Sequence, residues 1–112
     1  MNREKTEAIV VFMTAATREE AERLAEILVT QRSAACVQIL PEIVSFYRWQ
    51  GEIARDAEIL ILAKTTIHKF AELEKTVREN HSYEVPEIVA VPAEAVSATY
   101  LKWLVTETDN RD

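Results

Sequence analysis

The chain has 112 residues with one glycine and one cysteine, and its 13 basic and 19 acidic residues give a formal net charge of −6. A chain of this length forms a single domain, here expected over residues 1–112, that removes roughly two-thirds of its unfolded surface from water and folds without a cofactor. The negative charge disfavours nucleic-acid backbones and anionic membranes as partners, and a single glycine excludes the glycine-rich phosphate loops of nucleotide-binding proteins.

The first predicted strand is the apolar run from Ala8 to Met13. Because this run is too short for a signal-peptide core or a membrane span, and the residues before it are polar, we expect a cytoplasmic protein without a membrane segment. The lone Cys36 agrees with this compartment, because the chain has no second cysteine for an intramolecular disulfide.

A helix is predicted after this strand. Thr17 and Glu20 have the spacing of a capping box, in which the two side chains satisfy free amides at the start of a helix. Apolar residues then recur every three or four positions, which predicts one buried helix face. That face comprises Ala21, Leu24, Ala25 and Leu28.

A long hairpin follows the helix. Ala35–Leu40 is predicted as a second strand, which Pro41 interrupts because proline cannot donate to a strand ladder, so we expect a bulge there. The strand resumes from Ile43 to Trp49. Gln50-Gly51 is the predicted turn, since glycine adopts the positive φ that tight hairpins require, and the third strand runs from Glu52 to Ala63.

Two further helices flank a fourth strand. Lys64–Thr66 leads out of the third strand, and Thr66 is the predicted cap of the second helix. The buried side of that helix is predicted to comprise Ile67, Phe70, Leu73 and Val77. The fourth strand is predicted over Ile88–Val91, and a short terminal helix over Ser97–Thr106.

The resulting order, βαββαβ plus a terminal helix, matches the split βαβ arrangement of an α+β protein, in which both main helices lie on one face of an antiparallel sheet. The strand centres are apolar at both parities, which is typical of strands buried on both faces. One short helix is a poor cover for the second face. Because burial returns about 25 cal/mol per Å² of apolar surface, we predict a homo-oligomer in which copies cover one another's sheets.

The segment with the most side-chain chemistry is His-Ser-Tyr-Glu-Val-Pro-Glu over residues 81–87. An imidazole, a phenol and two carboxylates are groups that bind cations, relay protons or fix small ligands. His81 follows a predicted helix end, where it either binds a ligand or interacts with the last carbonyls of the helix. Glu84 and Glu87 either bind a hard cation or form ordinary ion pairs.

Other candidate residues also have two interpretations. Cys36 and Met13 are either soft metal ligands or core side chains. A set of aromatic residues with one lysine either lines a pocket between subunits or packs the oligomer. This set comprises Trp49, Lys64, Tyr83, Tyr47 and Tyr100. We predict no enzymatic activity, because no sequence signature joins Cys36 to a histidine base.

Five blocks of the sequence, taken in order, resemble the CutA divalent-cation tolerance proteins. The blocks are Ser33–Val37, Ser45–Gly51, Lys64–Thr66, His81–Glu87 and Tyr100–Trp103. Together they span nearly the whole chain. The chain departs from the family pattern at Met13 and Asn80, where members with a proposed copper site have cysteine and histidine.

The resemblance implies a ferredoxin-like subunit and a compact homotrimer, similar in plan to PII-type signalling proteins, with clefts between subunits. It also implies a non-enzymatic role in tolerance of copper or another divalent cation, which is not required for folding. The metal site predicted on this basis combines His81 with Met13, Cys36 or Glu84, from the same or an adjacent subunit.

Two alternatives stay open from the sequence. A PII-like sensor binds a small organic anion between subunits, against Lys64, Trp49 and Tyr83, and signals to a protein partner that the sequence does not identify. A trimeric scaffold binds no small ligand at all. The three interpretations can be distinguished by the compounds that stabilise the folded protein, because a ligand stabilises only the state that binds it. These would be metal ions, a small organic anion, or no small compound.

Overall fold

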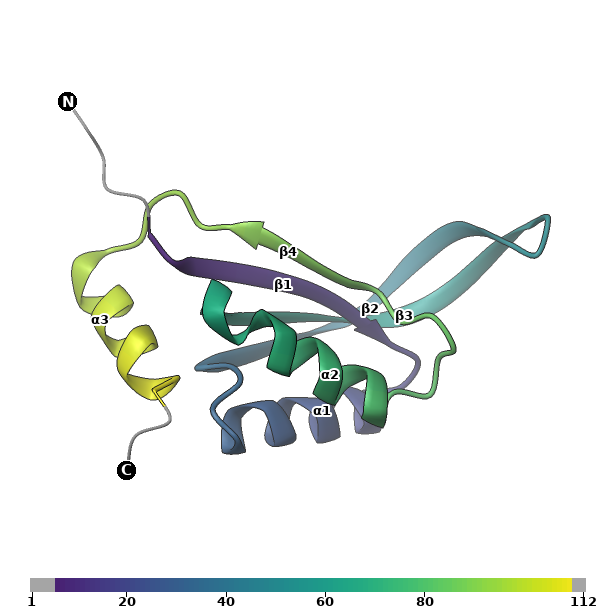
Figure 1. Cartoon of the computed structure of the whole chain (residues 1–112). Coiled ribbons are helices and arrows are strands. Elements are labelled where there is room, and N and C mark those ends of the chain that lie inside the picture. The colour runs from purple at the N-terminus through teal and green to yellow at the C-terminus, as the bar shows by residue number, and fades with distance from the viewer. Residues whose placement is uncertain (1–5, 110–112) are drawn as a thin grey trace.

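The structure is a computed structural model that describes residues 6–109 (Figure 1). Its elements are β1 (Ala8–Ala15), α1 (Arg18–Thr30), β2 (Cys36–Trp49), β3 (Glu52–Thr66), a 3₁₀ turn (Ile67–Lys69), α2 (Phe70–Asn80), β4 (Ile88–Pro92) and α3 (Ala98–Glu107). This order confirms the predicted βαββαβ arrangement with a terminal helix. The strands form one sheet in the order β2-β3-β1-β4, and every neighbouring pair is antiparallel.

The main core lies between the sheet and the helices α1 and α2, which run side by side beneath it in Figure 1. Alternate residues of β1 face these helices, and Val11, Met13 and Ala15 have no exposed surface. The helices contribute fully buried apolar side chains at the spacing of one helix face, namely Ala21, Leu24, Leu28, Leu73 and Val77. Removing one leucine side chain from such a core costs about 2–5 kcal/mol.

The opposite face of the sheet is covered at one end only. There α3 buries Leu104 against Ala8 and Ala35. Farther along this face, Val89 and Val91 of β4 keep 52% and 45% of their surface exposed. The prediction that the terminal helix leaves much of the second face open is therefore confirmed for the single subunit.

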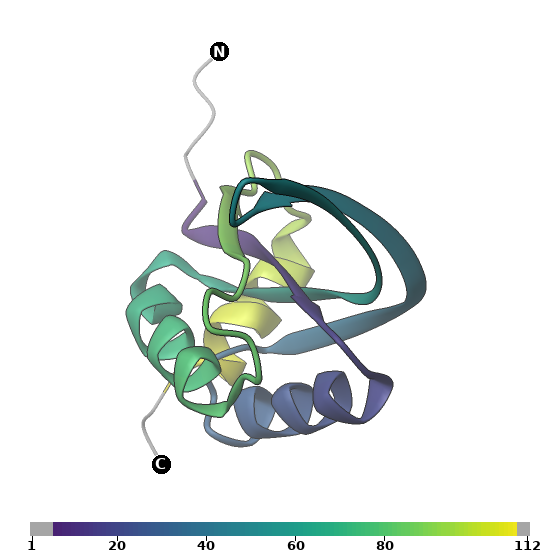
Figure 2. The ribbon, with the colours of Figure 1, turned by 90° about the vertical axis from the view of Figure 1, so that its right-hand side faces the viewer.

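The hairpin of β2 and β3 extends well beyond the body of the domain (Figure 1) and curls over, as seen end-on in Figure 2. The predicted interruption at Pro41 is confirmed, since the pairing register shifts between Leu40 and Ile43. The predicted turn is also confirmed. Gln50 and Gly51 both have positive φ, 50° and 84°, as a two-residue hairpin turn between right-twisted strands requires.

Two local predictions about the end of β3 were wrong. The strand does not end at Ala63 but continues through Thr66, because Thr66 pairs with Ala8 and Lys64 pairs with both Val10 and Cys36. Ile67 is not on the buried side of the second helix. It is 51% exposed, because a 3₁₀ turn precedes α2 and shifts its position relative to the helix face.

Thr66 stands at the N-terminal boundary of this 3₁₀ turn, but its side chain makes no capping hydrogen bond. The prediction that Thr66 caps the second helix was therefore wrong, because the 3₁₀ turn comes between them and Lys69 is the N-cap residue of α2.

The C-terminus of α1 ends in a left-handed residue that is not glycine. Arg32 has a φ of 64°. The amides of Arg32 and Ser33 donate to the carbonyls of Val29 and Leu28 at 3.2 and 2.9 Å, which is the Schellman pattern of helix termination. The Arg32 guanidinium also donates from Nη1 to the carbonyl oxygen of Glu107 at 2.9 Å, and so connects the ends of α1 and α3.

This geometry predicts a stability difference between two substitutions that both remove the guanidinium. Asparagine tolerates the left-handed conformation, whereas a β-branched valine does not. Arg32→Val is therefore expected to lower the free energy of unfolding by about 1–2 kcal/mol relative to Arg32→Asn. Denaturant unfolding of the two variants measures this difference, and equal midpoints would show that the backbone at position 32 carries no strain.

Candidate functional site

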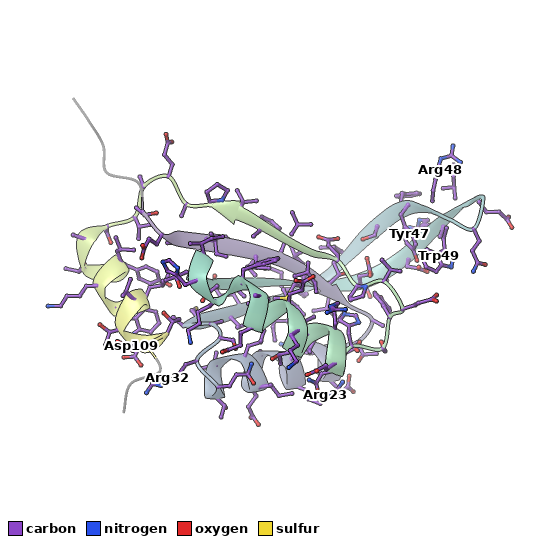
Figure 3. The ribbon with its side chains drawn as sticks, viewed as in Figure 1. Arg23, Arg32, Tyr47, Arg48, Trp49 and Asp109 are labelled. Atoms are coloured by element: carbon purple, nitrogen blue, oxygen red, sulfur yellow. The ribbon has the colours of Figure 1, made fainter. Side chains whose placement is uncertain are left out.

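A cleft of about 740 Å³ lies between the β2–β3 hairpin, including its outer half, and the loop of residues 81–87, which we call the cleft loop. Tyr47 and Trp49 lie on the hairpin (Figure 3). The full lining comprises Thr14, Ser45, Phe46, Tyr47, Trp49, Glu58, Ser82, Tyr83, Glu84, Val85, Pro86 and Glu87. The volume is in the range of small-molecule sites, and the mixture of aromatic and acidic side chains gives the cleft a defined chemistry.

The strand period places the hairpin residues of the cleft. Ser45 and Tyr47 are two positions apart on β2 and so project to the same face of the hairpin. They pair with Asp56 and Ala54 of β3. These two residues project to the same side of β3 as Glu58, which pairs with Ile43 directly after the bulge. Without the bulge the pairing register would be different at this point, so the residues around Pro41 help to determine which β2 side chains lie beside Glu58.

His81 has no exposed side-chain surface, and both of its ring nitrogens are engaged. Nε2 lies 2.7 Å from the carbonyl oxygen of Thr14, and Nδ1 lies 3.0 Å from the amide nitrogen of Tyr83. Because the amide must donate and the carbonyl must accept, the ring carries its proton on Nε2. A metal ion would have to break one of these hydrogen bonds to reach either nitrogen.

Glu20 connects the start of α1 to the cleft loop. Its carboxylate accepts hydrogen bonds from the Ser82 amide at 2.7 Å, from the Ser82 hydroxyl at 3.0 Å and from the Ala16 amide at 3.4 Å. Burial by itself would raise the pKa of Glu20, but these bonds and the nearby His81 ring outweigh it and lower the pKa. The ionised carboxylate is thus the stable form in the folded protein.

The predicted capping box is half confirmed. The Thr17 hydroxyl accepts from the Glu20 amide at 3.2 Å, as expected of an N-cap. The Glu20 carboxylate, however, accepts from Ala16 and Ser82 rather than from the Thr17 amide. Sequence reasoning recognised Glu20 as a helix-start residue and missed its contact with the cleft loop.

Glu58 is the second acidic residue that sequence reasoning missed. It is only 7% exposed, and its Oε2 accepts from the Tyr83 hydroxyl at 2.8 Å. Burial, followed by the hydrogen bond to Glu58, raises the pKa of Tyr83 well above its usual range, so the phenol stays protonated. Partial desolvation and the charge of Glu58 raise the pKa of Glu87, even though Glu87 lies at the surface.

The four predicted metal ligands do not meet within one subunit. Met13 is fully buried on the helix-facing side of β1, whereas Cys36 lies on the other face of the sheet, beside Tyr100 of α3. Glu84 is an exposed residue of the cleft loop, and the His81 nitrogens are occupied. Within residues 6–109, no three His, Cys, Asp or Glu side chains are grouped so that they would hold a metal ion.

The predicted aromatic set is divided between two ends of the subunit. Tyr47, Trp49 and Tyr83 line the cleft. Lys64 on β3 lies beside α3, where its Nζ is 5.9 Å from the centre of the ring of Tyr100, a residue of that helix. An arrangement that joins the two groups across subunits stays a prediction. His68 belongs to neither group and lies at the surface, with its side chain 67% exposed.

The lowered pKa of Glu20 predicts a specific pH dependence of stability. A carboxylate with a lowered pKa in the folded state contributes stability that is fully present above its unfolded value, near 4.5, and is lost as the pH falls through the lower folded value. The Glu20→Gln variant is therefore expected to be less stable at pH 7 and to lose less stability on acidification below pH 4.5. Denaturant unfolding across this range tests it, with the exposed Glu26→Gln on the same helix as the matched control. An identical acid-side slope in wild type and Glu20→Gln would contradict the assignment.

Comparisons with known proteins agree with this architecture. The family model described as CutA1 divalent ion tolerance protein matches residues 9–107. The divalent-cation tolerance protein CutA of Thermus thermophilus is 48% identical over 99 residues, covering 88% of this chain and 96% of that protein. The chloroplastic protein CutA of Arabidopsis thaliana is 41% identical over 92% of this chain, which spans 57% of the plant protein's length.

Solved structures show the same fold. The structure of the divalent cation tolerance protein from Thermus thermophilus superposes with a TM-score of 0.89 at 46% identity, covering 91% of this chain and 99% of that one. The Oryza sativa CutA1 structure gives a TM-score of 0.90 at 37% identity, covering 96% and 98%. The chain therefore has a ferredoxin-like α+β fold, as predicted.

The comparisons do not assign a compartment. A CutA structure from Archaeoglobus fulgidus, 37% identical with a TM-score of 0.89 over 91% of this chain and 99% of that one, is described as periplasmic, and the Arabidopsis thaliana relative is chloroplastic. None of the helices within residues 6–109 has the length and apolar character needed to cross a membrane. A cytoplasmic location stays a prediction.

The family model and the relatives together establish that the chain belongs to the CutA1 family of divalent ion tolerance proteins.

Proposed function

We propose that this chain serves in divalent-cation tolerance as a non-enzymatic, homotrimeric protein that binds cations in the cleft between the hairpin and the cleft loop. The role in tolerance is supported by the names of the relatives. Self-association is supported by the open apolar face of the sheet. We also propose that folding requires no cation, which the apolar core between the sheet and the helices supports.

The observation that carries the choice of site is the charge of the cleft. Three carboxylates, those of Glu58, Glu84 and Glu87, line it, and no lysine, arginine or histidine of residues 6–109 belongs to the lining. Desolvation, followed by the negative charge of Glu58, raises the pKa of Glu87, so these two carboxylates are near enough to influence each other. Hard divalent ions bind to one or two carboxylates while keeping several waters, so they do not need three converging side chains.

Copper is a second form of the same proposal. His81 would bind it with Met13, Cys36 or Glu84. Because these side chains lie apart in one subunit, and the His81 ring is hydrogen-bonded through both nitrogens, this form requires contributions across a subunit interface and a change at His81.

The PII-like alternative has partial support from the cleft. Its volume and the rings of Tyr47, Trp49 and Tyr83 suit a small organic ligand. A negatively charged ligand, however, would face the carboxylates, and Lys64 would have to come from a neighbouring subunit. The scaffold alternative rests on the open sheet face alone.

Substitution of Glu87 separates the two forms of cation binding. If divalent ions bind at the cleft carboxylates, Glu87→Gln is expected to weaken Mn²⁺ binding by roughly threefold or more. The variant loses one contact to a charged group, and a contact of about 0.7 kcal/mol corresponds to a roughly threefold change in affinity. Calorimetric titration measures this, with His81→Ala tested in parallel and Glu26→Gln as the charge-matched control. Unchanged affinity in Glu87→Gln together with a loss in His81→Ala would transfer the proposal to the histidine site.

The proposed trimer predicts a mass of three times 12.8 kDa by light scattering at micromolar concentration. A charge on the open face should disfavour assembly, because it would be desolvated between subunits. Val91→Asp is therefore expected to release monomers, whereas Val29→Asp on α1, where the side chain is similarly exposed at 44%, is expected to leave the mass unchanged. A wild-type mass of 12.8 kDa would contradict the trimer.

A further inference from the structure

The three carboxylates of the cleft are distributed rather than convergent. Glu58 lies on β3, and Glu84 and Glu87 are three positions apart on the cleft loop. Residues 6–109 offer no group of three His, Cys, Asp or Glu side chains around one point, so a divalent ion would have only one or two of these carboxylates as ligands and would leave the others unpaired. Negative charges placed around a cleft of about 740 Å³ match a ligand whose positive charges are also separated.

Glu58 has an incomplete set of partners. The residue is only 7% exposed, and Oε2 accepts from the Tyr83 hydroxyl. It forms no ion pair within the described part of the chain. Its other oxygen, Oε1, accepts no side-chain hydrogen bond there, and it is not sealed from solvent. An ammonium group at Oε1 would supply both a positive charge and a donor, neither of which the described part of the chain provides there.

The aromatic walls suit the rest of such a ligand. In the isolated chain Tyr47 and Trp49 are 42% and 43% exposed, so their rings offer apolar surface to methylene groups and π faces to a cation. The same hairpin already places the Arg55 guanidinium 5.7 Å from the centre of the Phe46 ring. Val85 and Pro86 add apolar surface on the cleft loop.

We propose that the cleft binds a linear di- or polyamine, in which ammonium groups pair with Glu58 and with Glu84 or Glu87 while the methylene segments lie against Tyr47 and Trp49. The proposal rests on the cation-binding cleft of the proposed function and names an organic ligand class for it. It requires spacing between the charges of the ligand, which a metal ion does not have. It also requires that monoamines bind weakly, because they satisfy one carboxylate only.

A homologous series of amines tests this proposal on the full chain. Butylamine, 1,4-diaminobutane and spermidine are titrated calorimetrically in phosphate buffer with about 150 mM salt, which suppresses attraction to the overall charge of −6. Affinity is expected to rise at least about tenfold from the monoamine to the triamine, because each added ammonium gains a charge-assisted contact. Equal affinities across the series would overturn the proposal.

Substitutions then locate the site. Glu58→Gln is expected to weaken spermidine binding at least about tenfold, whereas Glu26→Gln, which removes the same charge from α1, is expected to leave it unchanged. Should Glu58→Gln fail to fold, the surface double variant Glu84→Gln, Glu87→Gln decides the question with the same expectation. In the Trp103→Phe background, Trp49 is the only tryptophan, so its fluorescence should change on binding.

The outcomes for metal and amine are separable. Mn²⁺ binding that depends on Glu87, without spermidine binding, would overturn the amine proposal and leave the proposed function in place. Spermidine binding that depends on Glu58, without Mn²⁺ binding, would support the amine proposal and contradict the metal role of the cleft. Losses that are equal in Glu58→Gln and Glu26→Gln would show only general charge attraction and would overturn the amine proposal.

Discussion

The buried carboxylate of Glu20 is the contact on which the geometry of the cleft depends. It lies in the first turn of α1 and accepts both the amide and the hydroxyl of Ser82, 62 positions later in the chain. The two neighbours of Ser82 make the next contacts: the His81 ring donates to the Thr14 carbonyl, and the Tyr83 hydroxyl donates to Glu58. The cleft loop is thereby held against β1, α1 and β3 at once. Because the loop forms one wall of the cleft, these few hydrogen bonds determine its shape.

A second constraint acts on the opposite side of the sheet. The face of the sheet that packs on α1 and α2 is buried, whereas the other face is covered only at one end, by α3. At the other end of the sheet, the β2–β3 hairpin extends away from the body of the domain (Figure 1). Exposed valines of β4 make an isolated subunit an unfavourable state in water. The proposed assembly and the proposed site are therefore linked, since the hairpin that walls the cleft also belongs to the surface that would meet a neighbouring subunit.

Much of the fold could be predicted from local patterns, and much of the site could not. Apolar periodicity located the strands and helices, and the Pro41 bulge and Gln50-Gly51 turn followed from backbone chemistry. The contacts of Glu20 and Glu58 join residues 62 and 25 positions apart, so no local pattern reveals them. The proposed ligands Met13 and Cys36 are each credible in sequence, yet the parity of their strands places them on opposite faces of the sheet.

Amide hydrogen exchange at Ser82 measures the central contact most directly. In the wild type the Ser82 amide donates to Glu20, and removal of the acceptor in Glu20→Ala should speed its exchange at least about tenfold at neutral pH. The Val11 amide in the middle of the sheet should keep its protection, and Glu26→Ala should leave both amides unchanged. Unaltered exchange at Ser82 in Glu20→Ala would show that the cleft loop is held by other contacts and would contradict this account.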